Sequence, residues 1–194
     1  GWYAFYQSRK GLDNNHLNTV ANYFIIGSLA NITWLFLWHY NYPQLSTVPM
    51  VVLFISLIMA FKAAGRAIAE NATLNTWAIR TPFSVYLGWI SVALTANISI
   101  TLYVANWNGW RISGPVWVAI LSIIIAIITI TILVRENAYA YALVIIWALV
   151  GIYVKFPNES AIALSTLPLS ALIGLATVTV WARSRGGFVS EMVN

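Results

Sequence analysis

The chain has 194 residues, of which 60% are hydrophobic and only 8% are charged, and its mean hydropathy is +0.78. Soluble domains carry about 25% charged residues, so this composition excludes an ordinary soluble protein and indicates an integral membrane protein. The formal net charge is +5, but the basic residues form no patch, which argues against nucleic-acid binding. The lack of cysteine excludes disulfides, thiolate metal sites and cysteine nucleophiles.

Six apolar stretches follow one another along the chain, and we expect each to cross the membrane as a helix. They are residues 19–39, 47–64, 82–105, 114–134, 138–154 and 161–181. A crossing needs about 20 apolar residues, so the fifth stretch is the marginal one. The predicted fold class is therefore all-α, a polytopic transmembrane helical bundle. Residues 1–7 look like the last turns of a helix, so we expect further residues upstream of Gly1.

The basic residues divide unequally between the two ends of the predicted helices. If the N-terminal loop lies on side A, six crossings place all Lys and Arg residues on side A except two. The two on side B are Arg111 and Lys155. Because cytoplasmic loops carry the excess of basic residues, side A should be the cytoplasmic face or its equivalent. Both ends of this chain should then lie on side A.

Polar and aromatic residues form one stripe on the first predicted helix and another on the third. The first stripe is Asn31, Trp34 and Trp38, and the second is Tyr86, Trp89, Ala93, Asn97 and Thr101. Spacings of three, four and seven residues put each set on one helix face. Because asparagine is costly against lipid, we expect the two helices to be neighbours whose stripes face a common interior space. The spacing alone favours interhelical hydrogen bonding somewhat over a ligand pocket, which stays open as the alternative.

Catalytic and nucleotide-binding motifs are missing from the sequence, and we predict no enzymatic activity. The five acidic residues all fall in predicted loops or tails, so no intramembrane carboxylate is available for a proton relay. This disfavours a secondary transporter. His39 is a candidate ligand for a tetrapyrrole metal, although we favour an ordinary interfacial histidine beside Trp38. We otherwise expect no metal site.

Residues 82–97 resemble the last-helix motif of the TspO/translocator-protein family, the tryptophan-rich sensory proteins. The shared pattern is Tyr-Leu-x-Trp, with an alanine four residues after the tryptophan and an asparagine eight residues after it. Residues 29–38 resemble that family's Asn-x-x-Trp segment, and residues 1–7 resemble the end of the helix before it. The resemblance covers residues 1–105.

The resemblance implies a membrane bundle that binds porphyrins, and in some members sterols, in a pocket lined by aromatic side chains. The residues that match pocket positions are Asn31, Trp34, Trp89, Ala93 and Asn97, and Trp38 and Tyr86 share their stripes. We divide the chain into residues 1–105, an N-terminally incomplete TspO-like bundle, and residues 106–194, three additional helices and a tail.

Two functions of different classes remain open at this point. The first is a membrane protein that binds a tetrapyrrole, a sterol-like molecule or a similar flat apolar ligand as its sensor, chaperone or carrier. The second is an accessory subunit of a larger membrane complex, such as one that bears pigment. Expected partners are the lipid bilayer, the ligand, and a second copy or larger complex. The expected location is a bacterial plasma membrane or a thylakoid.

Overall fold

The computed structural model describes residues 15–70 and 74–193, with side chains as far as Ser184. This part of the chain is all-α. Its long helices are α2 (Asn15–His39), α3 (Pro43–Glu70), α4 (Thr76–Val104), α5 (Gly114–Glu136), α6 (Tyr139–Lys155) and α7 (Ser160–Val193). Five are long and apolar enough to cross a membrane, while α6 has 17 residues and is shorter. The helix end expected at residues 1–7 lies outside the described residues.

The predicted helix starts at residues 47 and 82 are too late. Helix α3 begins at Pro43, because a proline in the first turn lacks only an N–H that would be unpaired anyway. Helix α4 begins at Thr76, where the side chain of Asn75 accepts a hydrogen bond from the Trp77 backbone N–H at 2.9 Å. Pro82 therefore lies inside α4 and does not open it.

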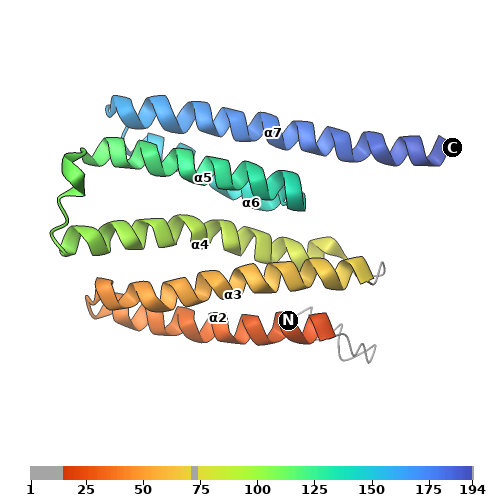
Figure 1. Ribbon diagram of the computed structural model, residues 1–194, viewed down its shortest axis with the longest axis horizontal. Helices are drawn as coiled ribbons and strands as arrows, with labels where there is room; N and C mark the ends of the chain where they lie inside the picture. The colour runs from red at the N-terminus through yellow and green to blue at the C-terminus, as the bar shows by residue number, and fades with distance from the viewer. Residues whose placement is uncertain (1–14, 71–73, 194) are drawn as a thin grey trace. The chain divides into compact units, whose positions relative to one another are not determined.

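Residues 1–106 form the first of two compact units, and α3 is its central helix. Figure 1 shows α3 between α2 and α4, and α3 packs along both of them. Its buried residues accordingly run along most of its length and around more than one face. Packing on two sides explains why this helix is the most buried of the candidate membrane spans.

The prediction that the first and third helices are direct neighbours is wrong for most of their length. Helix α3 separates α2 from α4, and no comparable packing joins those two. Their rings do meet at one point, where Phe24 and Phe83 form an edge-to-face pair with centroids 6.1 Å apart. Helix α3, which packs on two sides, fills the interior space that the stripes of α2 and α4 were expected to share.

Small side chains allow the three helices of unit 1 to approach closely at one end. The buried cluster there contains Leu17, Val20, Ala63, Ala64, Ala67, Leu74 and Ile79. At the same end, His16 Nε2 of α2 lies 2.9 Å from Glu70 Oε1 of α3. Even the loss of one methyl group would leave a gap in such close packing.

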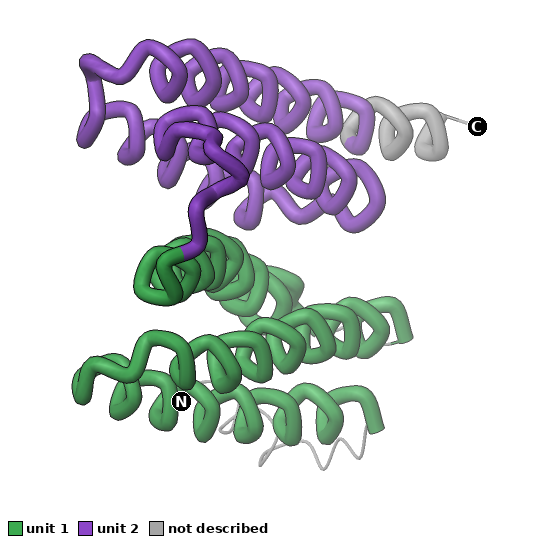
Figure 2. The backbone as a smooth tube through the Cα atoms, turned by 60° about the vertical axis from the view of Figure 1, so that its left-hand side comes forward, with its two compact units in different colours: residues 1–106 green, residues 107–194 purple. Residues whose placement is uncertain are grey.

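Residues 107–194 form the second compact unit, in which all three helices contact one another. Figure 2 shows α5, α6 and α7 as one bundle, and α6 returns the chain from the end of α5 to the start of α7. The buried side chains of α6 are Tyr141, Ala142, Ile145 and Leu149, at the three- and four-residue spacing of one helix face. Its 17 residues span about 25 Å, which explains why its length is marginal.

Cysteine labelling can test whether α4 crosses the membrane in the predicted direction. The chain has no native cysteine, and Thr76 and Ala105 are exposed at opposite ends of α4. We expect Ala105→Cys to react with an impermeant maleimide from outside intact cells, and Thr76→Cys to react only after permeabilisation. The unsubstituted protein is the unlabelled control. Labelling of both variants from the same side would contradict the topology.

Candidate functional site

Asn31, Trp34 and Trp38 lie on the side of α2 that packs toward α3. They continue the line of Gly27, where an added Cβ would lie only 3.3 Å from Leu53 Cδ1 of α3. Asn31 and Trp34 are half-buried, and Trp38 is 37% exposed. Past the close approach at Gly27, the α2 face therefore changes from small residues to large aromatic ones that remain partly accessible.

The two indole rings of this α2 face are stacked on each other. The centroids of Trp34 and Trp38 are 6.0 Å apart and their planes differ by 25°. Trp34 Nε1 is buried and has no hydrogen-bond acceptor among the residues that the structure describes. A buried donor without an acceptor costs about 1–3 kcal/mol, so this N–H is a place where an oxygen acceptor would be favourable.

Asn97 of α4 is 2% exposed, and both ends of its amide are hydrogen-bonded to α3. Its Nδ2 donates to Ser46 Oγ at 3.0 Å, and its Oδ1 accepts from Thr47 Oγ1 at 2.7 Å. These contacts are the interhelical hydrogen bonding that the stripe pattern allowed. As predicted, Asn97 points into the protein, but its partners are side chains of α3.

The network continues from Asn97 to the first turn of α3. The Pro43 carbonyl oxygen accepts from Ser46 Oγ at 2.7 Å and from Thr101 Oγ1 at 3.0 Å. Thr47 and Thr101 hydroxyl oxygens are 2.9 Å apart. Sequence reasoning missed Ser46 and Thr47, although two hydroxyl residues just after a helix-opening proline are a usable signal for such a network.

Trp34 and the polar network lie at a similar depth in unit 1. Helices α2 and α3 are antiparallel and joined by the short turn at residues 40–42, so positions equally far from the turn are level with each other. Trp34 is five residues before His39, and Thr47 is four residues after Pro43. The stacked indoles and the hydrogen-bonded hydroxyls thus occupy the same end of the unit, opposite the small-residue cluster.

The α4 stripe is divided between the packed and the exposed sides of the helix. Asn97 is buried, Tyr86 and Ala93 are half-buried, and Trp89 is 50% exposed. The expectation that Trp89 is turned inward is therefore wrong. The eight residues from Trp89 to Asn97 turn the helix by about 800°, which leaves the two side chains about 80° apart. The side that packs on α3 is centred farther round, on residues such as Leu87, so Asn97 falls within it and Trp89 outside it.

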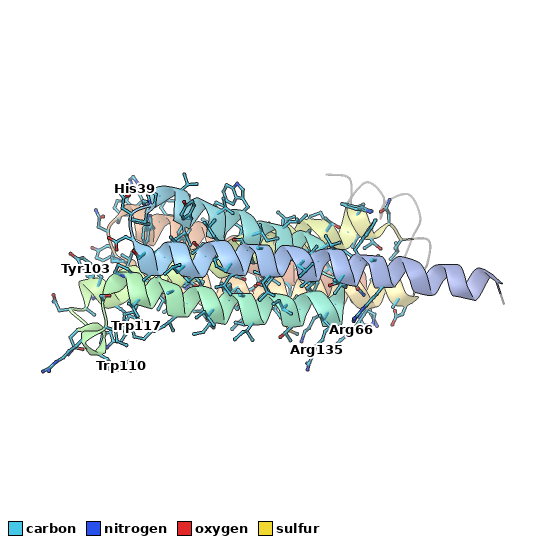
Figure 3. The ribbon with its side chains drawn as sticks, turned by 90° about the horizontal axis from the view of Figure 1, so that it is seen from above. His39, Arg66, Tyr103, Trp110, Trp117 and Arg135 are labelled. Atoms are coloured by element: carbon cyan, nitrogen blue, oxygen red, sulfur yellow. The ribbon has the colours of Figure 1, made fainter. Side chains whose placement is uncertain are left out.

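The histidines do not form a metal site with other residues that the structure describes. His39 lies at the end of α2, labelled in Figure 3, and its ring meets Tyr40 edge-to-face at 5.3 Å. No group of three histidine or acidic side chains that could hold a metal ion occurs within residues 15–70 and 74–184. The ring of Tyr40 is thus an aromatic neighbour of His39.

A family described as "TSPO-like protein" matches this chain over residues 1–181. The match begins in unit 1 and continues through α5 and α6 into α7, so it covers more of the chain than the resemblance over residues 1–105. Comparison with curated proteins and with solved structures finds no match.

Proposed function

Because the chain belongs to the family of TSPO-like proteins, we propose that it binds a tetrapyrrole or a similar flat, largely apolar ligand within the membrane. The family and the membrane-spanning helices supply the context of a ligand-binding membrane protein. We propose three further points: the class of the ligand, the residues that contact it, and the role of the protein as a sensor, chaperone or carrier of that ligand.

The buried N–H of Trp34 is the observation that supports this proposal most directly. It has no acceptor in the described part of the chain, and it belongs to a ring that is already stacked on a second indole. A porphyrin presents a flat π surface together with carboxylate oxygens, which are the two features that this pair of rings can use. A sterol-like ligand would offer a single hydroxyl oxygen and no π surface.

The proposed contacts assign a different task to each residue. Trp38, which is partly exposed, offers a ring face for stacking, and Trp34 donates its N–H to an oxygen of the ligand. Asn31 lies one turn before Trp34 on the same face and can donate a second hydrogen bond. Tyr86, Trp89 and Ala93 form a second candidate surface on α4, where small Ala93 leaves room beside the indole.

Asn97 has a supporting task in this proposal. Its amide is occupied by Ser46 and Thr47, so it holds α3 against α4 at the level of the aromatic pair. The ligand surface on α2 then packs against α3, and α4 holds α3 in position through the Asn97 hydrogen bonds. The setting that we propose for this site is a bacterial plasma membrane or a thylakoid, where tetrapyrroles are in use.

Titration of the purified protein with protoporphyrin IX tests the proposal. We expect saturable quenching of tryptophan fluorescence with a dissociation constant in the micromolar range or tighter, because a macrocycle on an indole quenches it. Detergent micelles without protein, containing free tryptophan, are the control for absorption by the porphyrin. A linear, non-saturating decrease like that of the control would contradict binding and would favour the accessory-subunit alternative.

A further inference from the structure

Three tryptophans pack against one another where the chain enters α5. The ring centroids of Trp107, Trp110 and Trp117 are 5.3 to 5.7 Å apart for each of the three pairs. Trp117 Nε1 also donates to the Gly109 carbonyl oxygen at 2.9 Å. Figure 3 shows Trp117 on α5 and Trp110 in the loop that precedes it. We call these three residues the tryptophan cluster.

The backbone of this loop is held in an uncommon conformation. Gly109, Trp110 and Arg111 have φ values of 59°, 52° and 64°, in the left-handed region that residues with a Cβ seldom adopt. The Asn108 side chain accepts a hydrogen bond from the Trp110 backbone N–H at 3.1 Å. Two consecutive non-glycine residues stay in this region only when their surroundings fix them, and the packed indoles supply that restraint.

The strained loop presents one aromatic ring and one cation side by side. Trp110 is 71% exposed although it touches two other indoles, and Arg111 is exposed directly after it. The loop lies between α4 and α5, which are both long enough to cross a membrane, so it belongs at the bilayer surface. Indoles favour the headgroup layer, and guanidinium groups bind phosphate with paired hydrogen bonds.

We propose that the tryptophan cluster and Arg111 form a binding site for the phosphate of an anionic phospholipid. The guanidinium pairs with the lipid phosphate, and Trp110 packs against the glycerol and upper acyl chain. The left-handed backbone from Gly109 to Arg111 fixes the loop that carries both groups on adjacent residues. The occupant is a lipid of the surrounding leaflet, which the exposed ring can reach without leaving the interface.

Native mass spectrometry of the full chain with added phosphatidylglycerol can test this site. Arg111→Gln is expected to weaken the tightest-bound lipid by about fivefold, the upper end of the effect of one exposed ion pair. The matched control is Lys155→Gln, which removes the other basic residue predicted on side B and is also exposed. Equal lipid binding by the two variants would overturn the proposal. Displacement of the lipid by inorganic phosphate alone would also overturn it, since the ring contact would then contribute nothing.

A second pair of variants separates the site from a general effect of charge. A Cβ at Gly109 would lie 3.2 Å from Trp117 Nε1 and would require a left-handed alanine, so Gly109→Ala should disturb the cluster while leaving Arg111 in place. At Gly114 an added Cβ meets nothing within 4 Å, which makes Gly114→Ala the control. We expect weaker phosphatidylglycerol binding only in Gly109→Ala. Unchanged binding in Gly109→Ala, with melting shifted as a sign that the loop did move, would show that the loop geometry is not needed.

Discussion

Replacing Trp34 with alanine is expected to weaken protoporphyrin binding by about five- to a hundredfold. The substitution removes one ring of the stacked pair. It also removes the Trp34 N–H, which is buried and has no acceptor among the described residues. Removing the Trp34 N–H leaves a buried ligand oxygen without its donor, which costs about 1–3 kcal/mol, and about 1.4 kcal/mol corresponds to a tenfold change in affinity. The measurement is the dissociation constant from fluorescence quenching, with the remaining tryptophans as the reporter.

Two further variants define what Trp34 contributes. Trp34→Phe keeps an aromatic face but removes the N–H, so its affinity should fall between those of the unsubstituted protein and Trp34→Ala. Trp147→Ala is the control, because it removes an indole that is 64% exposed on α6 in the other unit. Trp89→Ala measures the second candidate surface on α4. If Trp34→Ala and Trp89→Ala both bind like the control, the porphyrin site is not where we propose.

Replacing Asn97 with alanine is expected to lower the free energy of unfolding by about 1–3 kcal/mol in the absence of any ligand. The substitution removes hydrogen bonds to Ser46 and Thr47 and leaves their polar atoms with fewer partners in a buried site. Single interhelical hydrogen bonds in membranes are worth about 0.6 kcal/mol on average, so most of the effect comes from losing two together and from the cavity. Chemical unfolding in detergent, followed by circular dichroism, gives the measurement.

Ser99→Ala is the matched control for this prediction. Ser99 lies two residues from Asn97 on the same helix, is exposed, and bonds only to the carbonyl of Thr95 within α4. Its loss should change the unfolding free energy by less than about 0.5 kcal/mol. Similar stability of the two variants would mean that the Asn97 network does not hold α3 against α4. If Asn97→Ala lowers stability only when porphyrin is bound, Asn97 contributes to ligand binding and not to the packing of α3 against α4.

The helices could be predicted from the sequence because length and hydropathy report directly on the cost of placing a chain in lipid. All six predicted stretches correspond to helices, and the fifth, α6, is the short one as expected. The starts of α3 and α4 could not be predicted as well, because the apolar run of α3 begins after its first turn and Pro82 was taken as the first residue of the next span. A helix tolerates Pro82 in its second turn when capping by Asn75 begins it earlier.

The composition of each stripe could be predicted, but the partner that each one meets could not. Spacing places Trp89 and Asn97 near one face of α4, yet it does not say which edge of that face touches a neighbour. That depends on the direction in which α3 packs, and α3 itself carries no comparable aromatic stripe. The α2 stripe was closer to the outcome, since Asn31, Trp34 and Trp38 do lie toward α3.

The small-residue cluster gives unit 1 two ends with different tolerance to substitution. Ala64 and Ala67 are fully buried between the helices, so any larger side chain there must push α3 away from its neighbours. Around Trp38, at the other end, the rings are partly accessible and can be exchanged without moving a helix. Substitutions at the aromatic end can therefore change the ligand surface that we propose there, while the alanine end keeps the same three helices in the same arrangement.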